Sequence, residues 1–282
     1  MKKILVAIDF SKGSVHALNY ARKLAEKLSA NITMVWVDSE CGIGAINAAI
    51  SNEFRTEAIK NFNELIALHK KDGSKAEIDY KLRRGKVYQE VANITRSLDI
   101  DLIVAGTHGV TGFEEFWIGS NAYRIVSYAP RPVITVRFDY SIKGDFKNIV
   151  LPIDSTSETK QKVPIACTMA RNLGAKIHIV GLHSTGLKSL HKKTLSNMGY
   201  VIRHCQKHNV VFESLEIQSN NITKSIIDYA INYEADLIAI MTEQQGSASS
   251  LLLGPQAEQL VNYSLIPVLS IQPSEIKTLT MR

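Results

Sequence analysis

The sequence has 282 residues, enough for about two ordinary domains. Its hydrophobic content of 45%, charged content of 21% and net charge of +6 are typical of a globular protein. They exclude a disordered chain and give no basic patch for nucleic acid. No apolar run reaches the roughly 18 residues of a membrane-spanning helix. From the charge and this hydropathy pattern together, we expect neither a nucleic acid nor a membrane as a partner.

Strands and helices are predicted to alternate along the first half of the chain. Short apolar runs predict strands at Ile4 to Ile8, Ile32 to Val37, Ala76 to Leu82, Ile100 to Ala105 and Pro132 to Val136. Helices are predicted from Ser14 to Leu28, from Phe54 to Lys71, through Val87, Val91 and Ile94, and from Ala122 to Val126. This order predicts a doubly wound α/β domain with a five-stranded parallel sheet covered on both faces.

The second half repeats the first. Lys3 to Asp9 matches Asn148 to Asp154, and Asp101 to Val104 matches Asp236 to Ala239. Self-similarity of this length indicates two copies of one fold. We predict domains at 1–140 and 146–282, joined by the polar segment Asp139 to Asp145. The first copy has about ten extra residues, which we assign to Ser39 to Ser51.

The chain begins in its first strand by Ile4, so we expect no secretory signal peptide. Its three cysteines, Cys41, Cys167 and Cys205, are an odd number and far apart in sequence. This usage predicts no disulfide framework and favours a reducing compartment. We therefore expect a cytoplasmic protein.

A glycine-rich segment predicts an anion site in the first copy. Gly106 and Gly109 follow a predicted buried strand, and Gly119 and Ser120 precede a predicted helix. Glycine lets backbone N–H groups approach a ligand closely. The first turn of a helix offers unpaired N–H donors at its positive dipole end.

The spacing Gly-x2-Gly-x9-Gly-Ser of these four residues resembles the nucleotide-binding signature of the universal stress protein family. The resemblance covers nearly the whole chain. It implies a tandem member with two Rossmann-like domains, similar to adenine-nucleotide hydrolases. It also implies that ATP or AMP, with Mg²⁺ on the phosphates, is bound as a stress-response signal. Domains of this family pair through their last strands, which implies an intrachain pseudo-dimer or a homodimer.

The resemblance also implies which residues form the site. On the nucleoside side they are Ile8, Asp9, Phe10, Ser11 and Val37. On the phosphate side they are Gly106, His108, Gly109, Gly119, Ser120 and Asn121, of which Asn121 is the weakest because that family position varies. Asp9 has an alternative interpretation as the cap of a turn or helix. The ligand stays open among ATP, AMP and a cyclic dinucleotide, and no catalytic or metal-ligating residue is expected.

The second copy departs from the signature. Where the first copy has Gly106, His108, Gly109 and Ser120, the second has Met241, Glu243, Gln244 and Pro255, and only Gly254 is retained. Side chains replace two glycines, Glu243 adds negative charge, and Pro255 lacks an N–H donor. We therefore expect one nucleotide site per chain, and for Asp154 in the second copy the role of a turn or cap residue.

Two other functions stay open, a nucleotide-free dimerisation scaffold and a slow ATP hydrolase or nucleotidyl enzyme. The intact glycines and Ser120 argue against the scaffold. The segment Asp9 to Ser14 lacks the Ser-Gly-Gly-x-Asp-Ser loop of ATP pyrophosphatases, and His108 has no Ser-His-Asp or paired-carboxylate pattern around it. At most slow ATP turnover is expected.

Two further motifs have structural interpretations. Gly42 to Asn47 resembles a dinucleotide fingerprint but lacks its third glycine, so we expect a flexible loop over the pocket. His204, Cys205 and His208 fall on one predicted helix, but no further zinc ligand is evident nearby. A solvated helix face is the expected role of these three residues.

Overall fold

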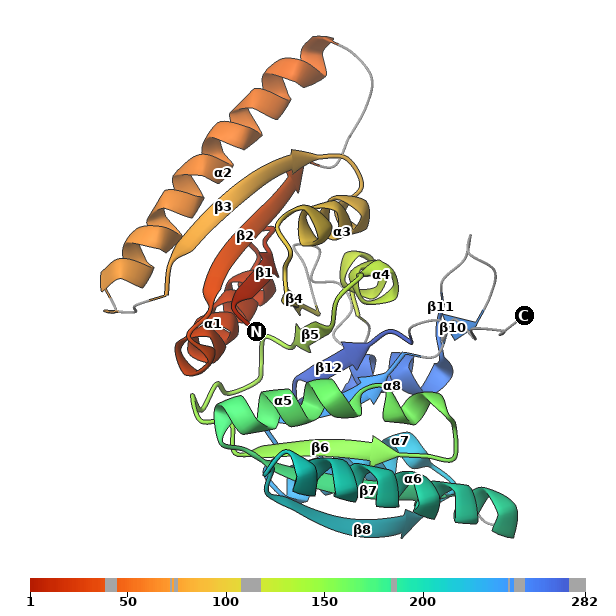
Figure 1. Cartoon of the computed structure of the whole chain (residues 1–282). Coiled ribbons are helices and arrows are strands. Elements are labelled where there is room, and N and C mark those ends of the chain that lie inside the picture. The colour runs from red at the N-terminus through yellow and green to blue at the C-terminus, as the bar shows by residue number, and fades with distance from the viewer. Residues whose placement is uncertain are drawn as a thin grey trace, which may run out of the picture.

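A computed structural model (Figure 1) describes residues 1–38, 45–71, 73, 76–107, 118–183, 187–242, 244–245 and 252–273. The first half of the chain runs β1 (Lys3–Ala7), α1 (Lys12–Leu28), β2 (Asn31–Asp38), α2 (Ala45–Lys71), β3 (Ile78–Arg84), α3 (Val87–Ser97), β4 (Leu102–Gly106), α4 (Ser120–Tyr128) and β5 (Val133–Val136). Within the described residues, no helix has both the length and the apolar character needed to cross a membrane.

The second half repeats this order with small changes. It runs β6 (Asn148–Ile153), η1 (Glu158–Lys160), α5 (Val163–Leu173), β7 (Lys176–His183), α6 (Lys188–Lys207), β8 (Phe212–Gln218), α7 (Ile222–Asn232), β9 (Leu237–Met241), the short pair β10 (Gln244–Gln245) and β11 (Leu252–Leu253), α8 (Pro255–Tyr263) and β12 (Val268–Ile271). The α/β fold and its internal duplication are therefore as the sequence predicts.

The two halves share one sheet of ten strands in the order β3-β2-β1-β4-β5-β12-β9-β6-β7-β8. Within each half all neighbouring strands are parallel, but β5 and β12 pair antiparallel, with Ile134 opposite Leu269. The five-stranded parallel sheet predicted for each half is therefore present, and the two sheets join edge to edge through their last strands, as the resemblance implies for a pairing within one chain. Figure 1 shows the strands of the first half and those of the second half on either side of this junction.

Hydrophobic side chains pack on both faces of the sheet. One large core spans both halves and includes buried residues of α1, α2, α5 and α6, such as Leu24, Phe62, Val163 and Val201. The opposite face has a separate core in each half, beneath α3 and α4 in the first and beneath α7 and α8 in the second. The segment 139–145 between β5 and β6 contains no helix or strand, as predicted for a connection.

The duplication extends to single hydrogen bonds. Oδ2 of Asp101, just before β4, accepts two backbone N–H groups at the start of β1. Asp236, just before β9, accepts two at the start of β6 in the same way. These two equivalent carboxylates hold the first strand of each half beside the fourth strand of the same half. The carboxyl ends of the first and fourth strands therefore lie at the same edge of the sheet.

One segment differs from the prediction. Helix α2 begins at Ala45, not at Phe54, so Ala45 to Asn47 are helical and not part of a flexible loop. The rest of the proposed fingerprint, Gly42 to Gly44, lies outside the described residues. The physical reason is composition, since three alanines among Ala45 to Ile50 favour helix strongly enough to outweigh the glycines that precede them.

Candidate functional site

The loop between β1 and α1 is built around Asp9. Oδ1 of Asp9 accepts hydrogen bonds from the Ser11 backbone N–H (3.0 Å) and from the Ser11 hydroxyl (2.5 Å). Oγ of Ser11 in turn caps α1 by accepting from the Ser14 N–H (3.2 Å). Both interpretations of Asp9 remain compatible with this geometry, since the carboxylate shapes the turn and is only half-buried at the sheet edge.

Phe10 and Ile8 contribute little side-chain surface to this edge. Phe10 adopts a left-handed backbone with φ of 62°, and its ring packs edge-on against Phe62 of α2, 4.9 Å between centroids. Ile8 is buried and donates its N–H to the Val35 carbonyl (2.8 Å). A ligand here would therefore meet mainly the backbone of these two residues. Val37, half-buried near the end of β2, lies on the neighbouring strand.

Gly106 ends β4 directly against the first turn of α1. A Cβ atom on Gly106 would lie 2.7 Å from the Gly13 carbonyl oxygen and 3.1 Å from the Ser14 nitrogen. Contacts this short with backbone atoms force the helix or the strand to move. Glycine at this position is thus required by the close packing of strand and helix, in addition to any approach of a ligand.

We expect Gly106→Ala to lower the free energy of unfolding by about 1–3 kcal/mol, as overpacking of a filled interior does. Gly199→Ala is the matched control, since Gly199 lies within α6 and its added Cβ would meet only the flexible end of Arg203 at 3.4 Å. That control should stabilise by about 0.5–1 kcal/mol. Urea unfolding measures both, and equal effects of the two substitutions would contradict the packing argument.

The start of α4 faces the same edge of the sheet. Gly119 is the N-cap residue of α4 and donates its N–H to the Thr107 carbonyl (2.7 Å), which fixes the helix start beside the end of β4. Ser120 and Asn121, the first two helical residues, are exposed. The Ile118 N–H donates to Oδ1 of Asn262 on α8 (2.8 Å), so the second half of the chain also holds this segment.

The predicted residues Ile8, Asp9, Phe10, Ser11, Val37, Gly106, Gly119, Ser120 and Asn121 therefore all lie at or next to the carboxyl ends of β1, β2 and β4. His108 and Gly109 lie outside the described residues. Parallel sheets of this kind bind ligands at this edge. The arrangement suits a ligand whose anionic group lies at the start of α4 and whose remaining part extends over β1 and β2.

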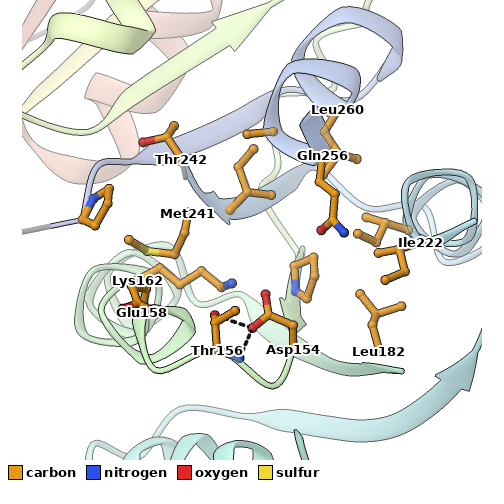
Figure 2. Close-up of a pocket in the computed structure, with 15 residues that line it drawn as sticks. Asp154, Thr156, Glu158, Lys162, Leu182, Ile222, Met241, Thr242, Gln256 and Leu260 are labelled. Carbon is orange, nitrogen blue, oxygen red and sulfur yellow. Dashed lines mark hydrogen bonds between the residues drawn. The ribbon is translucent and has the colours of Figure 1, made fainter. Parts of the chain in front are cut away.

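The corresponding edge of the second half contains a pocket of about 490 Å³ (Figure 2). The Asp9 turn is repeated here, since Oδ1 of Asp154 accepts the backbone N–H (2.7 Å) and the hydroxyl (2.5 Å) of Thr156. Asn197 of α6 supports the turn by donating to the carbonyl oxygens of Asp154 and Thr156, both at 2.9 Å. This confirms a turn role for Asp154.

The pocket opens because the helix after β6 starts late. Met241 stands at the end of β9 where the first half has Gly106, and Glu158 stands where it has Gly13. The side chain of Met241 lines the pocket, and it takes up space beside the strand that the first half leaves to the start of α1. The chain instead forms the 3₁₀ turn η1, and α5 begins only at Val163.

Lys162 lies in this pocket and was not singled out from the sequence. Its side chain is buried and extends toward Asp154 (Figure 2), and its Nζ donates to Oγ1 of Thr159 (3.1 Å). Burial lowers the pKa of Lys162 to about 8, although the nearby Asp154 carboxylate acts in the opposite direction. The repeat could have pointed to the burial of Lys162, because the matching residue of the first half is Ala17, which is buried.

The model of the universal stress protein family matches residues 1–137 and, a second time, residues 145–272. The chain belongs to the universal stress protein family. The two successive matches make it a tandem member, with one copy of the family's domain in each half of the sequence.

Similar proteins agree with this assignment. Universal stress protein YxiE of Bacillus subtilis is 28% identical over 147 residues, which are 48% of this chain and 98% of that protein. Universal stress protein MJ0531 of Methanocaldococcus jannaschii is 29% identical over 139 residues, which are 48% of this chain and 82% of that protein. The crystal structure of a universal stress protein from Archaeoglobus fulgidus has a TM-score of 0.79 at 18% identity and covers 96% of this chain and 98% of that one. The fold of that structure therefore extends through both halves of this universal stress protein.

Cys205 of α6 does not share the solvated helix face that the sequence predicts for it with His204 and His208. Cys205 is buried and lies 3.6 Å from Cys167 of α5, Sγ to Sγ, in the shared core. His204 and His208 lie near each other instead, with ring centroids 4.4 Å apart. Cys167 and Cys205 are free thiols that contact each other. Their spacing in the sequence gave no means of predicting this contact.

Proposed function

We propose that this universal stress protein binds one adenine nucleotide, with Mg²⁺ carried on its phosphates, at the sheet edge of its first half. Occupancy of that site is the stress-response signal that the protein conveys in the cytoplasm. The observation that carries the proposal is the meeting of Gly106, the Asp9 turn and the start of α4 at one edge. The free thiols of Cys167 and Cys205 are consistent with a reducing compartment.

The described residues at this edge offer hydrogen-bonding groups that match those of a nucleotide. The first turn of α4 supplies backbone N–H groups and the exposed hydroxyl of Ser120 for phosphate oxygens. Asp9 and Ser11 offer polar atoms for the ribose or base, and Val37 bounds the opposite side from β2. His108 and Gly109 complete the proposed phosphate side, as the sequence predicts.

The second half does not suit a polyphosphate. Its pocket places the carboxylates of Asp154 and Glu158 beside a single buried cation, Lys162. Met241 fills the position of Gly106, and Pro255 begins α8 without an N–H donor where Ser120 begins α4. Negative side chains and the missing donor both oppose phosphate binding, so we propose one nucleotide for each chain.

Calorimetric titration of the full chain with ATP and Mg²⁺ should therefore saturate near one nucleotide per chain. AMP and a cyclic dinucleotide, titrated in the same way, rank the three candidate ligands. A stoichiometry near two would mean that the second-half pocket also binds. Absence of binding for all three ligands would favour the nucleotide-free scaffold.

A further inference from the structure

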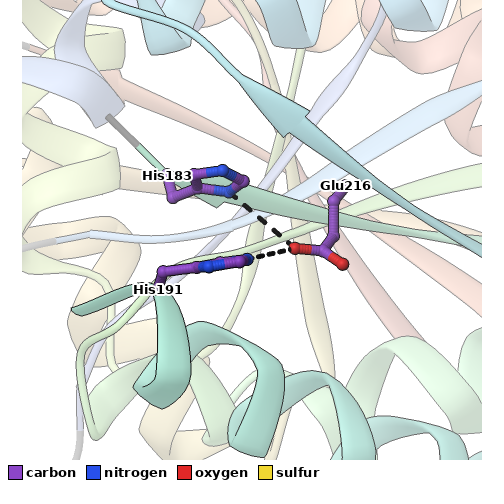
Figure 3. Close-up of side chains that lie close together, drawn as sticks. All are labelled: His183, His191 and Glu216. Carbon is purple, nitrogen blue, oxygen red and sulfur yellow. Dashed lines mark hydrogen bonds and ion pairs between the residues drawn. The ribbon is translucent and has the colours of Figure 1, made fainter. Parts of the chain in front are cut away.

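Three side chains with metal-binding atoms converge at the carboxyl ends of β7 and β8. His183 ends β7, Glu216 lies on β8, and His191 lies in the first turn of α6 beside them (Figure 3). One ligand atom from each side chain lies within 4.8 Å of the other two. His191 Nε2 donates to Glu216 Oε2 at 2.6 Å, and His183 Nδ1 lies 4.0 Å from the same oxygen.

The Nδ1 atom of His183 lacks a hydrogen-bond partner among the residues that the structure describes, although it is buried. Buried polar atoms are seldom left in this state, because each lost hydrogen bond is unfavourable. The rings of His183 and His191 lie 4.2 Å apart and tilted by 30°, and Figure 3 shows both directed at the Glu216 carboxylate. An ion held between the three side chains would give His183 Nδ1 its missing partner.

The spacing of the three atoms suits a small divalent cation. Zinc binds histidine nitrogen and carboxylate oxygen at about 2.0–2.2 Å, so neighbouring ligand atoms of a tetrahedral site lie about 3.3 Å apart. The observed distances of 2.6 and 4.0 Å lie on either side of that value, and small side-chain rotations would equalise them. The side chains of His191 and Glu216 are 41% and 37% exposed, so an ion can enter from solvent.

We propose that His183, His191 and Glu216 form a site for a divalent transition-metal ion, with zinc the best match to two imidazoles and one carboxylate. Solvent would provide the fourth ligand. This site is separate from the proposed nucleotide edge, which lies in the other half of the chain. It is also absent from the first half, where Asp38 stands in place of His183 and Leu82 in place of Glu216.

Zinc chloride titrated into the untagged, chelator-treated full chain tests the proposal. Calorimetry should give one zinc ion per chain, and cobalt added in its place should give the visible absorption bands of a four-coordinate site. Loss of a group that only supports a metal ligand weakens metal affinity by roughly 10- to 100-fold. His191→Ala and Glu216→Gln each remove a proposed ligand itself, so each should weaken zinc binding by more than that. Circular dichroism checks that both variants, altered at half-exposed side chains, keep the fold.

The double variant His204→Ala/His208→Ala is the matched control. These histidines are four residues apart, His204 in the last turn of α6 and His208 as its C-cap residue, and should not affect zinc affinity. Loss of binding in this control but not in His191→Ala would move the zinc ion to the other pair and overturn the proposal. Failure of the parent chain to bind zinc would overturn it as well and would leave a simple hydrogen bond between His191 and Glu216.

Discussion

Gly109→Val is expected to abolish ATP binding while leaving the chain folded. Gly109 follows Gly106 by three residues in the segment that joins β4 to α4, at the position where the resemblance places the phosphates. A branched side chain there would occupy the space of a phosphate and would oppose any positive φ that the segment adopts. Titration calorimetry with ATP and Mg²⁺ measures the loss, and urea unfolding checks stability.

Gln244→Val is the matched control, because Gln244 holds the corresponding position in the second half. It should leave the ATP affinity and the stoichiometry unchanged. If Gly109→Val binds ATP as tightly as the parent chain, the phosphates are not held by this segment. If Gln244→Val loses binding instead, the nucleotide belongs to the second half.

Lys162→Met is expected to stabilise the protein at neutral pH and to flatten part of its pH dependence. Burial lowers the pKa of Lys162 from the ordinary value of 10.5 to about 8 in the folded chain. Below pH 8 the folded and unfolded chains both carry the proton, and the buried charge is unfavourable. Since one pKa unit corresponds to about 1.4 kcal/mol, the full effect is about 3 kcal/mol.

The sign follows from proton binding. Between pH 8 and pH 10.5 the unfolded chain holds more protons on Lys162 than the folded chain, so the stability of the parent rises with pH in this interval. Lys162→Met lacks that rise, and its advantage over the parent should shrink as the pH increases. Urea unfolding of both chains across this pH interval measures the difference between their free energies of unfolding. Contributions from other titrating groups are common to both chains and cancel in that difference.

Lys192→Met, at an exposed position of α6, is the control and should follow the parent at every pH. A constant difference between Lys162→Met and the parent from pH 7 to pH 10.5 would contradict the lowered pKa. It would mean that the lysine is solvated through the pocket.

Local patterns were sufficient to predict most of the fold. Apolar runs such as Leu102 to Ala105 are buried strands, and the Ser11 to Leu28 region forms a capped helix. The repeat carried these predictions into the second half. The start of α2 was missed because a glycine pair precedes it, although the alanines after Ala45 favour helix.

Other features depend on contacts between distant segments and could not be read locally. The role of Gly106 in packing follows from its distance to Gly13, residues of different elements. The buried Lys162, the Cys167–Cys205 contact and the His183, His191 and Glu216 cluster likewise need the folded chain. The pairing of the last strands, β5 with β12, was expected only from family resemblance, because no sequence pattern specifies which strands meet.

A crystal structure of the full chain grown with ATP and Mg²⁺ tests the central claim most directly. The proposal predicts electron density for one nucleotide per chain, with its phosphates at the start of α4 and its nucleoside over the Asp9 turn and β2. Nucleotide density in the pocket lined by Lys162 and Met241, with none at the edge of the first half, would contradict it.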